Sequence, residues 1–521
     1  MILGVAFPLA AVLCLACFIW HRWRKFQLRD QMGLRGPPIG FFSGNIWPLV
    51  RESMKHGNEV RPEMFLGWLK TYGDDEGCMG LYIGSQLYVY TSSLELLKEV
   101  FVKQFNNFSD RQYLPMNGAF PFSHSVLTMP AKAGWKPVRA AVSPTFTTGK
   151  MKAMYGTVHS KIDVFLDVMR QRALAGKPFD IYDDFQALTL DVIAKVAFAI
   201  DCHSQNDRSD TFFVNVRNFL QESDLKKAWY LALMVFFPEL DYVYGKLRPY
   251  TKLGGYEAIL LKELTRTVKE RMAEGSSRQR RKDRRSVDVI DLLLEEKRND
   301  KTGTFELTEK HVVANCYAYL LAGYETTSTA LAFSAWLLAK HPEVQLQLQR
   351  ELDEQLAEDE EPTYDKVMQL PYLSAVFKEC LRYYPPVVIF TTRTCVRDTT
   401  VGHLRIPAGV EVGCSLGHVH MDPRNWEDPE TFNPDRFLEW RDRGRHPLSW
   451  MPFGVGPRNC VGLRFAEMEY KMAMTALLRR FTLSIPDDAP KELKLTQTNI
   501  LLRPLNGVWL TVATRSTKGE N

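Results

Sequence analysis

One cysteine stands in a sequence that suits chemistry. Cys460 lies in the segment 453–462, which reads F-G-V-G-P-R-N-C-V-G and precedes a helical pattern over 463–479. The glycines permit tight turns and a close approach to a flat ligand, and the free N–H groups at the start of a helix stabilise a thiolate. Such a thiolate is a nucleophile, which would want a histidine base, or a metal ligand, for example of haem iron. The alternatives are a buried structural cysteine and a phosphate loop, whose glycine spacing does not fit.

A hydroxyl and an acid lie inside the longest predicted helix. The pattern predicts a helix from about residue 307 to 340 that is apolar nearly all round from 316 to 338, so we expect it to cross the centre of the domain. Glu325 and Thr326 lie in its middle, beside Gly323. A mid-helix threonine usually bonds the carbonyl one turn back. A bend there, next to a glycine without side-chain bulk, could instead open a pocket in which the two groups pass protons.

Two pairs of polar side chains have helical spacing. Glu379 and Arg382 are three residues apart and share a face, where an exposed ion pair contributes about 0.2–0.5 kcal/mol. Trp135 and Arg139 are four apart, which places an indole N–H and a guanidinium on one face, as a carboxylate ligand requires. Pro137 interrupts that helix and is tolerated only in its first turn. The plainer interpretations are a surface ion pair and a core tryptophan beside a surface arginine.

The elements that position these groups belong to a large globular chain. Its 45% hydrophobic and 24% charged residues exclude disorder, collagen and a multi-span transporter. The formal net charge of +5 over 521 residues does not favour nucleic acid as a partner. The nine cysteines have no repeating spacing, and the C-x-x-C pair of Cys14 and Cys17 lacks further ligands nearby, so we expect reduced thiols in the cytosol.

The N-terminus predicts a membrane anchor. Residues 1–20 carry no charged side chain, and a helix of that length is about 30 Å long, the thickness of a bilayer's hydrocarbon core. Basic residues at 21–25 follow at once and should stay on the cytoplasmic side with the body. A cleaved signal peptide is the alternative, but no basic segment precedes the apolar run. A basic and Pro-rich linker is predicted over 21–50.

The remaining chain, 51–521, shows no internal linker and predicts one large, mainly helical domain with a smaller β portion. Strand patterns lie at 81–90 and 401–412, each with a Gly-containing turn in its middle. Pro342 ends the long helix and can begin the next. The basic run 278–285 is expected to be a solvated loop, with lipid contact or a nuclear localisation signal as alternatives.

The loop around Cys460 resembles the haem-binding loop of the cytochromes P-450, F-G-x-G-x-R-x-C-x-G. The resemblance continues in chain order through the N-terminal anchor and Pro-rich hinge, Trp135–Arg139, the A-G-Y-E-T-T of Ala322–Thr327, Glu379–Arg382 and Pro434–Phe437. Residues 143–150 and the A-G-Y-E-T-T segment are further similar to the drug- and steroid-oxidising family three and its relatives. The resemblance implies a mainly α fold with a smaller β portion, as a single cytochrome P-450-type domain behind one transmembrane helix.

The resemblance also implies a cofactor, haem b with the Cys460 thiolate as axial ligand of the iron. It implies further haem contacts from Phe453 in the loop, and propionate contacts from Arg458, Trp135, Arg139, Arg393 and Arg111.

Two other groups acquire roles from the resemblance. Glu379, Arg382 and Arg436 would form a buried three-way network that fixes the haem-side scaffold, where losing one partner costs about 3–5 kcal/mol. Thr326 and Glu325 would pass protons to the bound oxygen while the thiolate pushes electron density towards the iron, which together favour O–O cleavage.

The implied activity is that of a haem-thiolate monooxygenase of the endoplasmic reticulum membrane, which inserts one atom of O₂ into a steroid, fatty acid or xenobiotic. The chain shows no flavin or nicotinamide motif, so electrons from NADPH would come through a separate cytochrome P-450 reductase, alone or with cytochrome b5. A reductase-independent isomerase of peroxides and a haem-bearing sensor or carrier are the alternatives.

The residues expected to meet substrate and partner are largely aromatic, aliphatic or basic. The pocket is predicted to be lined by parts of 113–126, 211–250, 387–392 and 499–502. An acidic partner could be attracted by basic residues near the loop, or these could be plain solvated surface; they are Arg441, Arg443, Arg445, Arg464 and Lys471.

Overall fold

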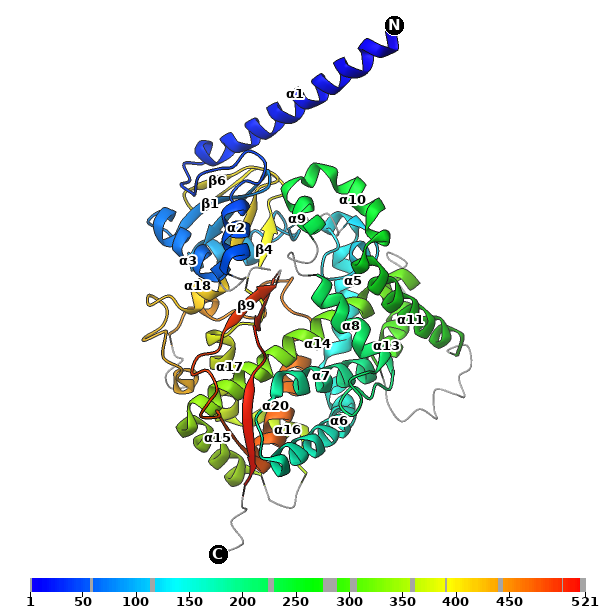
Figure 1. The fold of residues 1–521 in the computed structure, drawn as a ribbon, viewed down its shortest axis with the longest axis vertical. Helices are drawn as coiled ribbons and strands as arrows, with labels where there is room; N and C mark the ends of the chain where they lie inside the picture. Colours follow the sequence, from blue (N-terminus) through cyan, green and yellow to red (C-terminus); the bar gives the residue numbers. More distant parts are fainter. Residues whose placement is uncertain are drawn as a thin grey trace, which may run out of the picture.

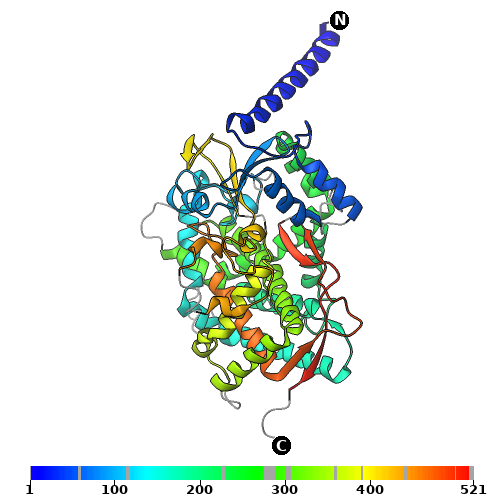
Figure 2. The same ribbon diagram turned by 90° about the vertical axis from the view of Figure 1, so that its left-hand side faces the viewer.

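The computed structural model describes residues 2–56, 60–112, 118–223, 229–274, 288–299, 307–356, 361–388, 391–438, 444–498 and 500–515. Figures 1 and 2 show a body of helices below a smaller β region, with the N-terminal helix projecting from the top. The predicted mainly helical domain with a smaller β portion is confirmed.

Helices account for most of the described chain. The α-helices are α1 (Ile2–Gln31), α2 (Ile46–His56), α3 (Val60–Tyr72), α4 (Leu94–Lys98), α5 (Trp135–Val142), α6 (Thr148–Ala175), α7 (Ile181–Phe198), α8 (Thr211–Glu222), α9 (Trp229–Phe236), α10 (Asp241–Leu247), α11 (Lys252–Glu274), α13 (Val289–Asn299), α14 (Glu309–Lys340), α15 (Pro342–Gln355), α16 (Tyr364–Gln369), α17 (Pro371–Tyr383), α18 (Leu416–His420) and α20 (Leu463–Arg480). Short helical turns are η1 (Glu99–Lys103), η3 (Phe122–His124), η4 (Ala131–Ala133), η5 (Ser143–Phe146), η6 (Pro238–Leu240), η7 (Arg248–Tyr250), η8 (Pro434–Phe437) and η9 (Pro447–Ser449).

The strands of the described residues form four small sheets. They are β1 (Cys78–Ile83), β2 (Gln86–Thr91), β3 (Phe179–Asp180), β4 (Thr392–Thr394), β5 (Thr399–Val401), β6 (Leu404–Ile406), β7 (Glu411–Cys414), β8 (Phe481–Ser484), β9 (Leu495–Thr498), β10 (Leu501–Pro504) and β11 (Trp509–Thr514). The largest sheet has the order β1-β2-β7-β4, in which only β2 and β7 pair in parallel. The others are β3-β11-β8, β10-β9 and β5-β6.

The helix predicted over 307–340 is confirmed as α14, which crosses the helical body (Figure 1). Thr308 begins it with a capping box, in which its hydroxyl accepts the N–H of His311 and the His311 ring accepts the N–H of Thr308. After the C-cap His341, Pro342 begins α15, as predicted. α14 packs against α7, α11, α17 and α20 and is buried along nearly its whole length.

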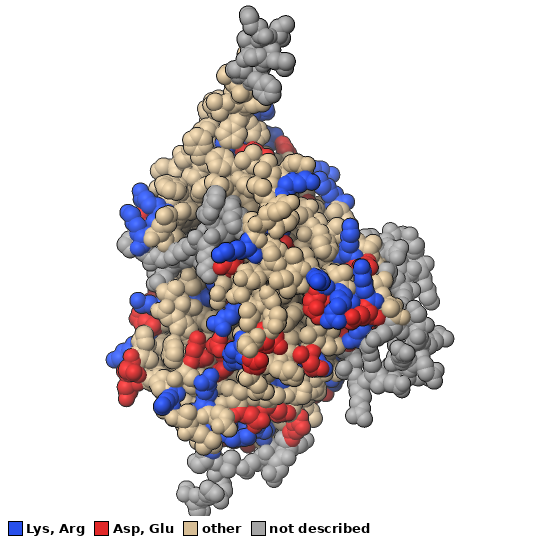
Figure 3. Space-filling model, turned by 45° about the vertical axis from the view of Figure 1, so that its right-hand side comes forward, with Lys and Arg blue, Asp and Glu red and all other residues tan. Residues whose placement is uncertain are grey.

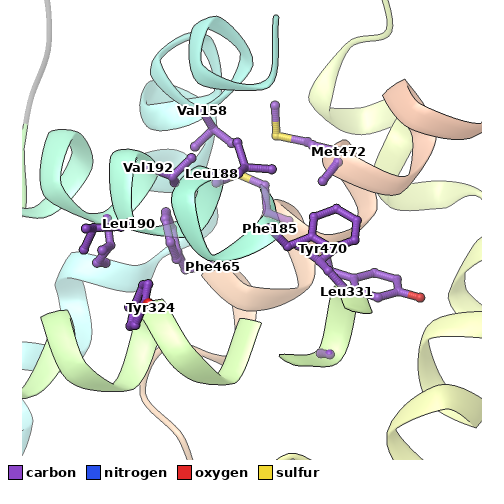
Figure 4. Close-up of a cluster of buried hydrophobic side chains, with 14 of the residues drawn as sticks. Val158, Phe185, Leu188, Leu190, Val192, Tyr324, Leu331, Phe465, Tyr470 and Met472 are labelled. Atoms are coloured by element: carbon purple, nitrogen blue, oxygen red, sulfur yellow. The ribbon is translucent and has the colours of Figure 1, made fainter. Parts of the chain in front are cut away.

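The largest hydrophobic core lies between α6, α7, α14 and α20 (Figure 4). Its members include Val158 of α6, Phe185, Leu188, Leu190 and Val192 of α7, Tyr324 and Leu331 of α14, and Phe465, Tyr470 and Met472 of α20. Each large apolar side chain that is fully buried contributes about 1.5–3 kcal/mol. Because α20 begins directly after the loop of Cys460, this packing holds that loop in place relative to α14.

Strands form in both predicted segments, but only the first segment is a hairpin about its predicted turn. β1 and β2 form a hairpin in which Ile83 pairs with Gln86 across a two-residue turn. In the second segment the turn lies at 402–403, where Val401 pairs with Leu404 of β6. β7 follows the predicted turn but joins another sheet, between β2 and β4. Alternation of apolar residues shows that a strand forms, and it does not show which strand will be its partner.

The N-terminal helix differs from its predicted boundaries. α1 is continuous from Ile2 to Gln31 and so runs through the first part of the predicted linker, while α2 begins within the last part. The side chains of residues 1–8, and with them part of the predicted anchor, lie outside the described residues. In the described part of the chain, no helix combines the length and the apolar character that crossing a membrane needs. The basic run 278–285 is also outside the described residues.

Candidate functional site

The loop before α20 is folded tightly around one side chain. The backbone N–H of Cys460 donates to the carbonyl of Phe453 at 2.8 Å. Gly456 has a φ of +72°, and a Cβ there would lie 2.0 Å from the carbonyl oxygen of Phe101, so only glycine fits. The loop therefore fixes Cys460 just before Gly462, the N-cap of α20.

The thiol of Cys460 is surrounded by protein and accessible at the same time. Burial raises its pKa, while the N–H of Gly462 and the charges of Arg139 and Arg111 act in the opposite direction. Yet the side chain is accessible to solvent. A side chain with both properties faces the inside of the domain, where a bound metal can reach the sulfur and replace its proton.

Four predicted arginines gather around this loop, and we call them the arginine cluster. They are Arg111, Arg139 of α5, Arg393 of β4 and Arg458 of the loop itself. Arg111 donates from Nη2 to the carbonyl of Arg458 at 2.8 Å, and Arg139 donates from Nη2 to Oδ1 of Asn459 at 2.9 Å. Arg393 Nη2 points to the loop carbonyl of Val455 at 3.4 Å.

The arginine cluster concentrates positive charge in the interior. Burial lowers the pKa of all four guanidiniums, that of Arg111 to about 10 and that of Arg458 to about 9. Repulsion from Arg111 lowers the pKa of Arg393 and Arg458 further. The carboxylate of Asp110, 3.8 Å from Arg458, opposes this shift. Positive charge in such a place favours the binding of an anion.

Haem b, the cofactor implied by the resemblance, fits this donor set. Nη1 of Arg458 and Nε of Arg393 are buried without a hydrogen-bond partner among the described residues. A buried donor without an acceptor costs about 1–3 kcal/mol. Haem carries two propionates, which could accept from these donors and balance the charge while the iron meets the Cys460 sulfur.

Trp135 does not have the orientation predicted for it. Its indole N–H donates to the carbonyl of Val126 at 3.0 Å, and its ring lies 4.1 Å from the guanidinium carbon of Arg458. Trp135 is the first residue of α5, and Pro137 lies in the first turn, as required. The predicted propionate contact of Trp135 is therefore corrected: its N–H is used by the backbone, and its ring supports Arg458.

A short strip of α14 is accessible although the helix is otherwise buried. Ala322 is exposed and Thr326 is partly accessible, whereas Tyr324, Glu325 and Thr327 are buried. Oγ1 of Thr326 donates to the carbonyl of Ala322, one turn back, at 2.6 Å. A strip of this kind in the middle of a central helix faces an interior space, so a ligand can reach the Thr326 hydroxyl.

Gly323, next to this strip, faces α7. A Cβ at this position would lie 3.1 Å from Cδ1 of Ile193 on α7. The glycine thus lets α7 and α14 pack closely, and this contact explains it better than the pocket opening predicted from the sequence.

Glu325 also turns away from Thr326, because successive helix residues point about 100° apart. Its carboxylate is buried and accepts from the hydroxyl of Tyr182 at 2.5 Å and from Nε2 of Gln186 at 3.1 Å. Arg503 lies 3.4 Å from the same carboxylate. The structure therefore does not place Glu325 where its predicted proton transfer would need it.

The predicted buried network of Glu379, Arg382 and Arg436 is present with all three members in contact, and we call it the scaffold network. On α17, Nε and Nη2 of Arg382 meet the two carboxylate oxygens of Glu379 at 2.7 and 2.8 Å, and both side chains are fully buried. Nε of Arg436 lies 3.2 Å from the same carboxylate, and the N–H of Asn433 donates to it at 2.8 Å. Arg382 also donates to the carbonyl of His420 at 2.9 Å. The two guanidiniums share this one carboxylate, and backbone carbonyls accept their other N–H groups.

The predicted pocket segments meet over α14 where they are described. Phe122 of η3 and Phe219 of α8 both pack edge to face on Tyr317, with ring centroids 5.8 and 5.9 Å away. Val387 pairs with Leu501, which joins the other two segments. The described residues do not include 113–117, 224–228, 389–390 and 499.

The predicted basic surface near the loop is only partly present. Arg464 is exposed, whereas the guanidinium of Arg445 stacks 4.2 Å from the ring of Trp426. The prediction is wrong for Lys471, which is 1% exposed and donates to the hydroxyl of Ser374 at 2.7 Å. The helical spacing of α20 turns Lys471 towards α17 rather than to solvent. Arg441 and Arg443 lie outside the described residues.

Two residues that hold members of the arginine cluster in place were missed by the sequence analysis. Asn459 orients Arg139, and Asp110 pairs with Arg458 and also accepts the N–H of Ala131 at 2.5 Å. Asn459 stands inside the loop, so its position was a usable signal. Asp110 lies far from the loop in the sequence and gives no comparable signal.

Comparison with known proteins extends the similarity over nearly the whole chain. The sequence model of the family described as "Cytochrome P450" matches residues 46–511. "Cytochrome P450 3A5" of Homo sapiens is 31% identical over 94% of this chain and 93% of its own length. "Cytochrome P450 3A29" of Sus scrofa is 32% identical over 94% and 92%, and "Cytochrome P450 3A13" of Mus musculus is 33% identical over 84% of each chain. The resemblance to family three is confirmed.

Proposed function

Since the chain belongs to the cytochrome P450 family, we propose that it is a microsomal-type monooxygenase that inserts one atom of O₂ into a lipophilic substrate. The family assignment makes it a cytochrome P450 monooxygenase with haem b and a cysteine thiolate ligand. The roles of individual residues, the electron donor, the substrate class and the membrane attachment belong to the proposal.

The observation that carries the proposal is the meeting of an accessible thiol and the arginine cluster at one loop. Cys460 would provide the thiolate, and the arginine cluster would hold the two propionates. Bound haem supplies oxygen activation at its iron, which the thiolate promotes by donating electron density. Phe453, whose ring lies 6.1 Å from that of Phe377, would cover one side of the loop.

Thr326 would handle protons from the accessible strip of α14. Its Oγ1 now donates to the carbonyl of Ala322, so its lone pairs can accept a proton from water. Rotation about χ1 would let the hydroxyl hand its own proton to the reacting oxygen. This role needs no carboxylate from Glu325, whose oxygens are held by Tyr182 and Gln186.

The aromatic contacts over α14 support a lipophilic substrate. Phe122, Phe219 and Tyr317 come from three segments and pack together there. Apolar walls bind apolar molecules by removing their surface from water. Steroids, fatty acids and xenobiotics are all consistent with this chemistry. The electrons would come from NADPH through a separate cytochrome P450 reductase, with cytochrome b5 as a further donor.

Exposed apolar side chains support attachment to the endoplasmic reticulum membrane. They include Ile19, Trp20 and Trp23 of α1, Phe42, Trp47 and Met54, and Tyr242, Val243, Leu247 and Tyr250 around α10. In Figure 3 the part of the face next to α1 is largely tan, and charged side chains are denser over the lower half. A large exposed apolar area of this kind is typical of a membrane contact.

The proposal is tested first by spectroscopy and then by turnover. Reduced protein gassed with carbon monoxide should give the red-shifted Soret band that is typical of a thiolate-bound haem, and Cys460→Ala should abolish that band. With reductase and NADPH, the protein should oxidise members of a panel of steroids, fatty acids and drug-like compounds.

Absence of the band would refute the haem-thiolate site. Turnover of a peroxide without any electron donor would instead indicate an isomerase, and absence of NADPH-dependent oxygen uptake a sensor or carrier.

A further inference from the structure

Arg22 is an arginine of α1 that is buried in the body of the protein. Its side chain is completely inaccessible, and Nη1 donates to the carbonyls of Phe41 and Phe42 at 2.9 and 2.7 Å. Nη2 donates to the carbonyl of Phe236 and pairs with a carboxylate oxygen of Glu239 at 3.2 Å. One guanidinium therefore joins α1, the chain after it and the segment between α9 and α10.

Aromatic rings complete the enclosure of this guanidinium. Its central carbon lies 4.9 Å from the ring centroid of Phe18 and 5.1 Å from that of Phe237. The rings of Phe18 and Phe237 are 6.5 Å apart, and that of Phe42 is 6.2 Å from Phe237. Cation–π contacts become stronger when they are shielded from water. The nearby His21 and Arg24 of the same basic stretch are exposed, whereas Arg22 is completely buried.

Glu239 receives a second contact from the sheet. The hydroxyl of Ser85, in the turn between β1 and β2, donates to its other carboxylate oxygen at 2.9 Å. The neighbouring Gly84 is in backbone contact with α9, since a Cβ there would lie 2.3 Å from the carbonyl oxygen of Val235. Glu239, in η6 after α9, thus bridges α1 and the β1–β2 turn.

The ion pair is stabilised although it is largely removed from water. Burial would raise the pKa of Glu239, but the hydrogen bonds from Arg22 and Ser85 hold it below its ordinary value. Lys25, one turn further along α1, lies near enough that Glu239 acts to raise its pKa while burial lowers it. Removing either partner of such a pair leaves a charge without compensation.

We propose that Arg22 and Glu239 form a latch that holds residues 236–239 against α1 and the β1–β2 turn and thereby slows the passage of ligands to the haem. The proposal rests on the proposed function and on the prediction from the sequence that parts of 211–250 line the substrate pocket. The latch links three segments, at residues 22, 41–42 and 236–239, that are far apart in the sequence. Opening it would free residues 236–239, and no residue of the latch belongs to the arginine cluster or to the loop of Cys460.

Arg22→Ala is the decisive variant, and Arg24→Ala is its matched control. Both remove one positive charge from the same helix, but Arg24 is exposed and contacts only the ring of Trp20, at 5.6 Å, among its described contacts. Hydrogen exchange of the full-length, haem-containing protein reports the local opening. The amides of Phe237 and Leu240, which donate to the carbonyls of Leu233 and Phe237, serve as probes. In Arg22→Ala they should exchange about tenfold or more faster than in the wild type, and in Arg24→Ala at the wild-type rate.

Ligand kinetics report the consequence for access. Stopped-flow mixing with phenylimidazole, which shifts the Soret band when its nitrogen binds the iron, gives both rate constants. In Arg22→Ala we expect association and dissociation to accelerate together, by about 3–10-fold, with the equilibrium constant changed by less than about twofold. An effect on affinity alone, or the same acceleration in Arg24→Ala, would overturn the latch.

Milder variants keep the test valid if Arg22→Ala accumulates poorly. Ser85→Ala removes one contact of Glu239 and leaves Arg22 in place, while Glu239→Gln keeps the shape and removes the charge. Both should change exchange and rates in the same direction as Arg22→Ala, by smaller factors, and the double variant Arg22→Ala/Glu239→Gln should be no faster than Arg22→Ala. Wild-type exchange in both single variants would refute the proposal. A missing thiolate Soret band in the wild type would instead refute the proposed function, because the exchange measurement does not depend on activity.

Discussion

The protein buries two groups of arginines, and they differ in how their charge is balanced. In the scaffold network, Arg382 and Arg436 share the carboxylate of Glu379, and Arg382 also donates to backbone carbonyls. In the arginine cluster, burial and mutual repulsion lower the pKa values, and two donors find no acceptor among the described residues. The first group is complete within the chain, and the second requires an anion from outside it.

This difference separates a structural role from a binding role without reference to sequence motifs. A compensated buried ion pair holds elements together, here α17 and η8, and its loss leaves a charge stranded. An uncompensated group costs stability until a ligand supplies the missing charge. Substitutions in the scaffold network should therefore lower the unfolding free energy of the haem-free protein. Substitutions in the arginine cluster should raise it or leave it unchanged.

The largest effect is expected from Glu379→Ala. The change leaves the guanidiniums of Arg382 and Arg436 buried without their carboxylate, which should cost about 3–5 kcal/mol of unfolding free energy. We expect a protein that cannot retain haem, as measured by the ratio of haem to protein after purification. Glu343→Ala on α15, where the side chain is 70% exposed, is the control and should be neutral. Normal haem content in Glu379→Ala would remove the distinction between the two groups.

A smaller effect, of mixed sign, is expected from Arg393→Leu. Without haem, the change removes a buried charge that repels Arg111 and Arg458, so the unfolding free energy should stay constant or rise by about 1 kcal/mol. With haem, the lost charged hydrogen bond should weaken retention by about 10–100-fold. Transfer of haem to an acceptor protein measures retention. Arg405→Leu, at an 81% exposed position, should change neither quantity. Destabilisation of the haem-free protein by several kcal/mol would assign Arg393 to a structural role.

Thr326→Ala should leave the scaffold network and the arginine cluster unchanged and affect only turnover. The hydroxyl lies on the accessible strip of α14 and contacts no member of the scaffold network or arginine cluster among its described bonds. We expect unchanged haem retention, with the ratio of product formed to NADPH consumed reduced by about 10-fold. Thr326→Ser keeps the hydroxyl and should preserve the ratio. Undiminished coupling in Thr326→Ala would remove Thr326 from the mechanism.

The smallest effect concerns the pH dependence of the haem-free protein. Burial and repulsion lower the pKa of Arg458 to about 9 from 12.5. A base with a lower pKa in the folded state binds fewer protons there than when unfolded, so the unfolding free energy should rise as the pH increases above about 9. The rise is at most about 1.4 kcal/mol per pH unit, and Arg458→Met should reduce it. Urea unfolding of both proteins below and above that pH measures the difference, and equal slopes would contradict the repulsion.

The fold was predictable where local patterns decide the structure. α14 and α20 follow from the apolar spacing, and Pro342 marks the end of α14. The partner of β7 was not predictable, because it lies about 320 residues away in β2 and nothing local selects it. The burial of Arg22 was missed for the same reason, since its partners are near residues 41 and 236.

The sequence identified which residues belong to the site better than it identified the directions of their side chains. Motifs identified Cys460, the arginine cluster and the scaffold network, and the structure brings each of these sets together. The directions of Trp135 and Glu325 depend on neighbours, Val126 and Tyr182, that no motif contains. Adjacency in sequence suggested that Glu325 and Thr326 work together, but on a helix adjacent residues point to different sides.

The burial of Arg22 has a mechanical consequence for the long N-terminal helix. From Ile2 to Arg22 the unbroken α1 extends for about 30 Å, and Figure 1 shows it projecting from the body like an arm. An arm that is clamped at its base cannot tilt by itself. Whatever surface holds the far end of α1 must therefore also set the angle at which the whole catalytic body stands on that surface.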